Sequence, residues 1–123
     1  MLNDHYLNLK QVLLDKIKGN GGWVNCHSHI DRSFTIDKRL YRLANALRHE
    51  KWLLNADLRK SSTVSQVYDR MARSLELMIA QNVQAVGSFI DIDPHMKDKA
   101  IQAAQKVRDK YKSQITIKFI NHS

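Results

Sequence analysis

Residues 21–32 read Gly-Gly-Trp-Val-Asn-Cys-His-Ser-His-Ile-Asp-Arg. The run over 23–29 predicts a short buried strand, and the glycines before it are typical of the end of a helix. Successive side chains of a strand point to opposite faces, so His27 and His29 should project to the same side of a sheet. Two imidazoles placed in this way can reach one divalent metal ion, and the segment therefore predicts part of a metal site.

Helical and strand-like patterns alternate around this segment. Apolar residues at helical spacing predict helices over 3–19, 38–52, 64–81 and 94–111, while the stretch 53–60 favours no single structure. Two further strands are predicted over 84–91 and 115–120. Strands that alternate with helices imply a parallel sheet with right-handed crossovers, so we expect an α/β fold.

Local signals mark several of these boundaries. The cluster Ser61-Ser62-Thr63 is suited to cap the helix that follows, and Asp93-Pro94 is suited to begin the last helix with proline in its first turn. Trp23, Trp52 and Cys26 are expected to be packing residues of the interior or of helix contacts.

Length and composition indicate one globular domain. The chain has 123 residues, of which 43% are hydrophobic and 26% charged. No run of about 18 apolar residues occurs, so no membrane span is expected. The first residues lack the pattern of a secretory signal, and the single cysteine, Cys26, is compatible with a reducing compartment. We therefore expect a cytoplasmic protein.

The net charge of +8 raises the question of nucleic acid binding. Basic residues are spread over the whole chain and are densest over 38–60, where Glu50 and Asp57 are the only acids. This stretch matches no nucleic-acid-binding module, so nucleic acid is not expected to be a partner. Binding through 38–60 stays a separate hypothesis that steep salt dependence would support.

The His-x-His pair supplies only part of a catalytic metal site. Zinc and iron both accept neutral imidazole, and catalytic sites generally use three or more protein ligands. Asp31 is placed to support the loop or a ligand histidine from the outer shell, and Arg32 is placed to pair with Asp31. The alternative is that His27 and His29 are loop residues with ordinary hydrogen bonds.

The segment 21–32 resembles the first strand of the amidohydrolase superfamily. It is most similar to the cytosine deaminase-like branch, in which this segment reads His-x-His-Leu-Asp-Lys. Residues 78–94, Met-Ile-Ala-Gln-Asn-Val-Gln-Ala-Val-Gly-Ser-Phe-Ile-Asp-Ile-Asp-Pro, are similar to that branch's second strand with its Arg-Thr-His-Val-Asp-Val pattern. The resemblance covers most of the chain from Gly21 onward.

The resemblance implies a function and a fold. It implies hydrolysis of a C–N bond in a small nitrogen-containing substrate, such as a nitrogen heterocycle, by a water molecule activated by zinc or iron, with His27 and His29 as ligands. The fold it implies is the N-terminal portion of a TIM (β/α)8 barrel, and residues 1–123 would form one partial barrel domain. His122 falls where the branch often presents a side chain that contacts the substrate.

The chain also departs from this family. Gly87-Ser88-Phe89 stands where the branch has Arg-Thr-His, and Arg32 replaces its lysine, so cytosine itself is doubtful as the substrate. The family's other ligands, two histidines and an aspartate on later strands, are not in this sequence. The catalytic residues are therefore expected beyond Ser123, and this chain alone is expected to be inactive. The alternative is a non-catalytic α/β module that associates with itself or completes a barrel with a partner chain.

Overall fold

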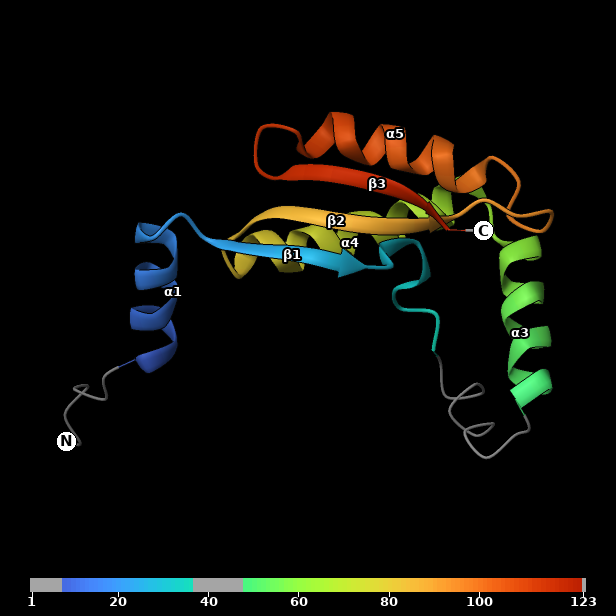
Figure 1. Ribbon diagram of the computed structural model, residues 1–123, viewed down its shortest axis with the longest axis horizontal. Helices are drawn as coiled ribbons and strands as arrows, with labels where there is room; N and C mark the ends of the chain where they lie inside the picture. The colour runs from blue at the N-terminus through green and yellow to red at the C-terminus, as the bar shows by residue number, and fades with distance from the viewer. Residues whose placement is uncertain (1–7, 37–47, 123) are drawn as a thin grey trace.

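Three parallel strands form the sheet of this protein, in the order β1 (Trp23–Ser28), β2 (Val83–Asp91) and β3 (Thr116–His122). The computed structural model describes residues 8–36 and 48–122 and is shown in Figure 1. Because the strands run in the same direction, their carboxyl ends lie at one edge of the sheet. The predicted α/β class and the three parallel strands are thus confirmed.

The pairing of β2 with β3 sets up the chemistry at that edge. The two strands stay in register from Ala85 opposite Thr116 to Asp91 opposite His122. The pairing of β1 with β2 is less regular, but Ser28 lies opposite Ser88. Residues that follow β1 therefore lie beside the last residues of β2 and β3.

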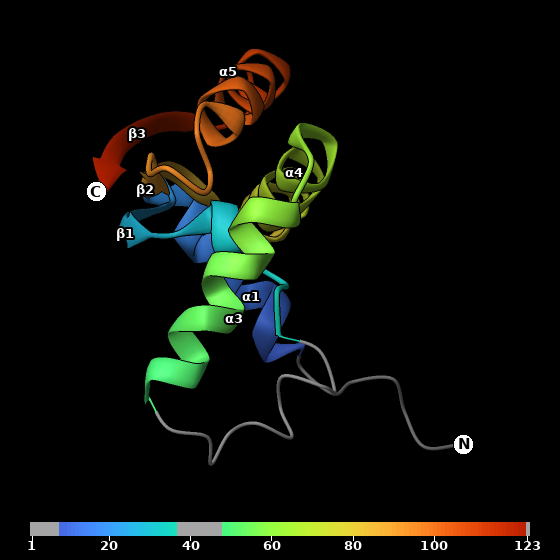
Figure 2. The same cartoon turned by 90° about the vertical axis from the view of Figure 1, so that its right-hand side faces the viewer.

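Two helices, α4 (Val64–Ala80) and α5 (Lys99–Tyr111), pack against the same face of the sheet, as the end-on view in Figure 2 shows. Alternate residues of β2 point toward them, and Val86, Ser88 and Ile90 are buried. The core formed between helices and sheet consists of Ile30, Val67, Met71, Ala72, Leu75, Val86, Ile90, Met96, Ala100, Ala103, Ala104, Val107, Tyr111, Ile115 and Ile117.

Two glycines allow β1 and β2 to lie close together. Gly22 has a φ of 82°, and a Cβ there would lie 2.5 Å from the carbonyl oxygen of Asn82. A Cβ on Gly87 would lie 3.1 Å from the carbonyl oxygen of Cys26. Because a Cβ would be crowded at both positions, glycine keeps the first strand against the second.

The predicted start of α4 is confirmed. The Thr63 side chain accepts a hydrogen bond from the Gln66 backbone N–H, and the Gln66 side chain accepts one from the Thr63 backbone N–H. This reciprocal pair is a capping box. The last helix starts later than predicted. Asp93 accepts hydrogen bonds from the backbone N–H groups of His95 and Met96, which stabilises a turn after β2, and α5 begins only at Lys99.

A third long helix, α3 (Arg48–Ser61), leads away from the carboxyl edge of the sheet (Figures 1 and 2). It extends past the predicted end at 52, and the part of that prediction over 38–47 lies outside the described residues. The Lys99 ammonium group donates to the carbonyl oxygens of Arg59 at 2.6 Å, Ser62 at 2.8 Å and Lys60 at 3.0 Å. This contact ties the end of α3 to the start of α5.

The prediction of a TIM barrel portion is wrong. The structure has an open sheet of three strands, in which β1 and β3 are the edge strands within the described residues. Alternation of strands and helices predicts parallel pairing, but it does not determine closure. Closure depends on the number, tilt and stagger of all the strands of a sheet, which no single βα pattern encodes.

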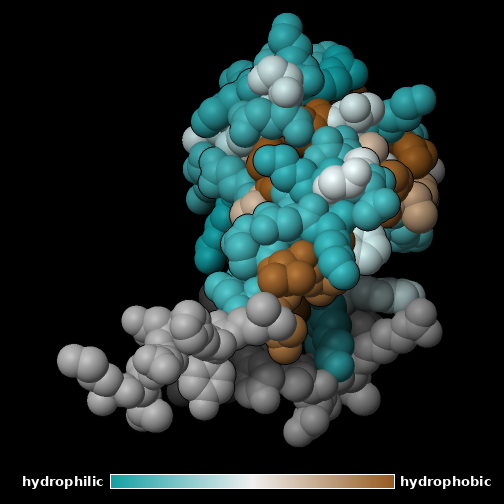
Figure 3. All heavy atoms as spheres, turned by 90° about the vertical axis from the view of Figure 1, so that its left-hand side faces the viewer, coloured by the Kyte–Doolittle hydropathy of each residue, from teal (hydrophilic) through white to brown (hydrophobic). Residues whose placement is uncertain are grey.

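The N-terminal part of the fold is more exposed than its sequence predicted. Helix α1 (Leu9–Gly19) begins after Asn8, which caps it, and contains no buried residue. The rest of the predicted helix, over 3–7, lies outside the described residues. β1 was predicted to be buried, yet Trp23 is 53% and Val24 69% exposed. Figure 3 views the molecule from the α1 end and shows apolar side chains at this surface.

Trp52 and Cys26 are also exposed rather than interior. Among the described residues, the helices that form the core with the sheet, α4 and α5, lie on one face of it, which leaves Trp23 on β1 exposed. None of the described helices combines the length and the apolar character that crossing a membrane requires.

Candidate functional site

Three histidines gather around Phe89 on the uncovered face of the sheet. His27 is in β1, His29 follows it directly, and their ring centroids lie 5.5 Å apart. The Phe89 ring lies 4.8 Å from His27 and 5.5 Å from His29. His122, at the end of β3, meets His29 edge-on at 5.4 Å. The two predicted ligands thus share one face, and the third predicted site residue, His122, joins them.

His29 is the most constrained of the three. It precedes a turn of 3-10 helix, η1 (Ile30–Arg32), and its Nδ1 atom is buried without a hydrogen-bond partner in the described residues. Burial, followed by the charge of Arg32, lowers the pKa of His29 below its ordinary value. This shift favours the neutral imidazole, which is the form that ligates metals.

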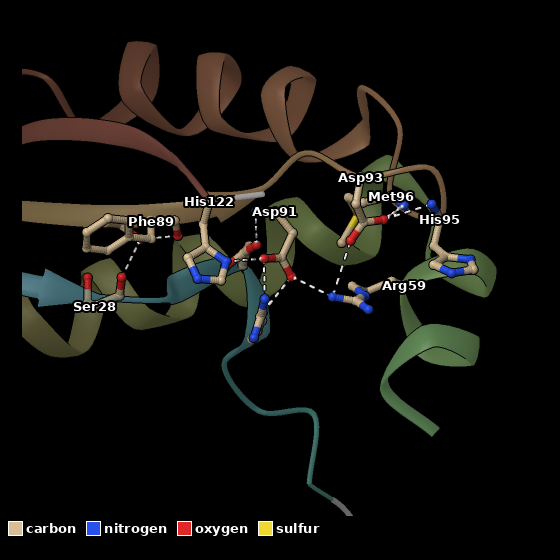
Figure 4. Close-up of polar contacts among 11 residues, drawn as sticks. Ser28, Arg59, Phe89, Asp91, Asp93, His95, Met96 and His122 are labelled. Carbon is tan, nitrogen blue, oxygen red and sulfur yellow. Dashed lines mark hydrogen bonds and ion pairs between the residues drawn. The ribbon is translucent and has the colours of Figure 1, made fainter. Parts of the chain in front are cut away.

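Asp91, the last residue of β2, is the centre of the ion pairs beside these histidines. Its buried carboxylate accepts two hydrogen bonds from the Arg32 guanidinium, and it lies 3.4 Å from Arg59 Nη1 and 3.5 Å from His122 Nδ1. Figure 4 shows Asp91 between His122 and Arg59, with Asp93 above the Arg59 guanidinium. Arg59 Nη1 also lies 3.2 Å from an oxygen of Asp93.

The charges around Asp91 determine its protonation. Burial raises the pKa of the Asp91 carboxyl, but the guanidinium groups of Arg32 and then Arg59 outweigh this effect and hold the pKa below its ordinary value. Asp91 is therefore ionised at neutral pH, and it holds side chains of η1, α3 and β3 at one point.

Asp31 is fully buried, and its carboxylate forms a hydrogen bond with the backbone of β2. One of its carboxylate oxygens accepts from the Asp91 backbone N–H at 2.9 Å, and its carbonyl oxygen accepts from Arg70 Nε at 3.0 Å. Burial raises the pKa of Asp31. Asp31 thus links η1, which follows β1, to the end of β2. The expected pairing of Arg32 with Asp31 is wrong, because the Arg32 fork lies on Asp91.

Arg59, Phe89 and the central place of Asp91 were missed at the level of sequence. Asp91 had been interpreted as a strand-end residue, and no local spacing links it to Arg32, which is 59 positions away. The sequence signal that could have indicated this role is the pair Asp91 and Asp93, which stands between an apolar strand and a proline. Asp93, expected to begin the last helix, lies instead in the turn after β2.

The histidine cluster fits a metal ion only in part. Two imidazoles on one face are suitable donors for zinc or iron. In the described ranges, however, no group of three or more histidine, cysteine or acidic side chains is arranged to hold a metal ion. The cluster can therefore provide a pair of ligands, and a complete site needs donors from elsewhere.

Comparison with known proteins gives a relative and no family. No family model matches the chain. The chain is 41% identical over 125 aligned positions to an uncharacterized protein of Haemophilus influenzae. The alignment covers 99% of this chain but 45% of that relative, so the chain spans less than half of the relative's length.

Proposed function

We propose that this chain carries part of the active site of a metal-dependent hydrolase that cleaves a C–N bond in a small nitrogen-containing substrate. The observation that supports this most strongly is the convergence of His27 and His29 on one face, with His29 Nδ1 buried and unpaired. The similarity of residues 21–32 to the amidohydrolase pattern supports the same reading.

The cation's role would be to acidify a water molecule that adds to the carbon of the C–N bond. This chain's residues would prepare the site for it. His27 and His29 would supply two ligands, while Asp31 fixes the loop that carries His29. His122, held beside Asp91, would contact the substrate. The remaining ligands would come from a longer polypeptide, and the relative's greater length is compatible with this.

Zinc and cobalt binding test the ligand pair. The 123-residue chain should bind Zn²⁺ weakly, and His27→Ala or His29→Ala should each weaken binding at least about tenfold, as measured by isothermal titration calorimetry. Binding of Co²⁺, followed by its visible spectrum, should show imidazole ligation that both variants lose. The chain alone should release no ammonia or amine from C–N substrates, because two imidazoles do not complete the site.

The matched control is His95→Ala, since His95 is an exposed histidine in the turn after β2. This variant should bind Zn²⁺ as the unmodified chain does. Equal affinity in the His27→Ala variant, or equal weakening in the His95→Ala variant, would contradict the proposal. The hydrolase activity itself can be tested on the longer Haemophilus influenzae relative, in which a chelator should abolish C–N cleavage.

Self-association is a second candidate function, and the exposed apolar surface favours it. Leu9 and Leu13 on α1 are 70% and 57% exposed, and Val24 on the edge strand β1 is 69% exposed. An edge strand with apolar side chains is a template for pairing with another chain. In this case the protein would retain the His-x-His motif, but its histidines would take no part in catalysis.

Light scattering after size-exclusion chromatography tests association. The chain should form a concentration-dependent dimer, and Val24→Lys should shift it to a monomer because a charge on an edge strand opposes pairing. Leu77→Lys is the control, since Leu77 is 50% exposed but lies on helix α4 rather than on a strand. A monomer at all concentrations would exclude this candidate.

The compartment belongs to the proposal as well. A lone exposed cysteine, Cys26, suits a reducing environment, and we propose that the protein acts in the cytoplasm on a small molecule. Nucleic acid binding through 38–60 is not part of the proposal, and residues 38–47 of that stretch lie outside the described residues.

A further inference from the structure

A groove lies between η1 and α3, beside the ion pairs of Asp91. Its volume is about 640 Å³, and we call it the α3 groove. This volume is in the range of pockets that hold small ligands. The residues that line it are Arg32, Trp52, Leu53, Asn55, Ala56 and Arg59.

Arg59, which lines the α3 groove, has a buried polar atom without a partner. Arg59 Nε is buried and makes no hydrogen bond in the described residues. Arg59 also borders a second, water-sized cavity of about 20 Å³, together with Asp31, whose Oδ1 is likewise buried and unpaired. Unpaired buried donors are rare in folded proteins, so Arg59 Nε indicates a group that binds there.

The polar atoms around the α3 groove are mainly donors. Arg59 directs Nη1 toward Asp91 and Asp93, while its Nε has no partner within the described residues. Arg32 uses Nε and Nη2 on Asp91. The Asp91 carboxylate, which faces both guanidinium groups, already forms ion pairs with them. A ligand that complements this surplus of N–H groups must be rich in acceptors, as a carboxylate is.

The other half of the α3 groove is apolar. Trp52, Leu53 and Ala56 lie along one side of α3, and the exposed fractions of Trp52 and Leu53 are 61% and 63%. Apolar walls with a few convergent polar groups are typical of small-molecule sites. The walls suit the hydrocarbon body of a ligand whose charged end lies at the arginines.

We propose that the α3 groove binds a small organic carboxylate with an apolar body. Its carboxylate accepts hydrogen bonds from Arg59 and Arg32, and its body packs against Trp52, Leu53 and Ala56. The site shares no lining residue with the histidine pair, and it does not depend on bound metal. The inference therefore goes beyond the proposed function and can hold or fail without it.

Phenylacetate is a suitable probe for this site, in buffer that contains a chelator. Titration of the ¹⁵N-labelled chain should give saturable shifts of the Arg59 Nε–H and Trp52 indole N–H signals, with a Kd of about 1 mM or tighter. Phenylacetamide has the same shape without the charge and should bind at least about tenfold more weakly, because it lacks the second acceptor oxygen of the carboxylate.

Two variants test the residues. Arg59→Lys keeps the charge opposite Asp93 but removes Nε–H and the planar fork, and it should weaken phenylacetate binding at least about tenfold. Arg108→Lys makes the same change at an exposed position of α5 and should leave binding unchanged. Ala56→Leu fills the groove without altering any charge and should abolish binding while the fold and Zn²⁺ affinity persist.

Several results would overturn the proposal. These are the absence of saturable shifts up to about 20 mM phenylacetate, well above the expected Kd, equal binding of phenylacetamide, and equal weakening in the Arg108→Lys variant. A folded Ala56→Leu variant that binds normally would place the ligand elsewhere. An experimental structure in the presence of phenylacetate that shows only a bound water at Arg59 Nε would assign that donor to solvent.

Discussion

Replacing Asp91 with asparagine should lower the free energy of unfolding by about 2–3 kcal/mol at pH 7, as measured by urea denaturation. The substitution keeps the size of the side chain but leaves Arg32 and Arg59 without their shared counter-charge. Breaking a fully buried ion pair costs about 3–5 kcal/mol. The expected value is smaller because the side chains of Arg32 and Arg59 are 39% and 24% exposed and can gain hydration.

The loss should depend on pH in a defined direction. The pKa of Asp91 is lower in the folded protein than its ordinary value of 3.8, so ionisation of Asp91 stabilises the fold above that value. This stabilisation disappears as the pH falls through the folded-state pKa. The difference between the unmodified chain and Asp91→Asn should therefore be constant near neutrality and shrink below about pH 4.

The control for this experiment is Asp109→Asn on α5, since Asp109 is exposed and has no ion pair in the described part of the chain. It should change stability by less than about 0.5 kcal/mol at every pH. A difference between the unmodified chain and Asp91→Asn that grows toward acid pH would contradict the role assigned to Asp91.

Replacing Leu75 with alanine should cost about 3 kcal/mol of folding free energy. Leu75 is fully buried in the core between α4, α5 and the sheet, and the smaller side chain would leave a cavity there. Single domains are stable by about 5–15 kcal/mol, so this loss should appear as a large decrease in the midpoint of urea unfolding.

Leu77 provides a matched control on the same helix. It lies two residues further along α4 and is 50% exposed. Leu77→Ala should change the free energy of unfolding by less than about 0.5 kcal/mol. Similar losses in both variants would mean that α4 does not present its Leu75 face to the core.

The parts of the fold that the sequence predicted well are those with strong local signals. α4 was found from its apolar stripe and the Thr63 cap, and the structure confirms both. β2 and β3 were each placed to within about two residues, because apolar runs bounded by turn residues define them. Parallel pairing followed from the alternation of elements.

The parts that failed depend on distant residues. Trp23 and Val24 would be buried only if another element packed against them, and the periodicity of a strand does not indicate whether such an element is present. The ion pair of Arg32 with Asp91 joins η1, which follows β1, to the end of β2, and the pairing of the two strands brings them together. The late start of α5 reflects the affinity of Asp93 for the turn's N–H groups, which competes with helix initiation.

The contact of Lys99 with three carbonyl groups at the end of α3 has a consequence for motion. The carbonyl oxygen of Arg59 accepts one of these hydrogen bonds, and its guanidinium group pairs with the carboxylates of Asp91 and Asp93. Arg59 therefore connects the last turn of α3 to the 92–98 turn through both its backbone and its side chain. Neither should open alone, so the two segments should behave as one cooperative unit whose amide protons report the same free energy of opening in hydrogen exchange.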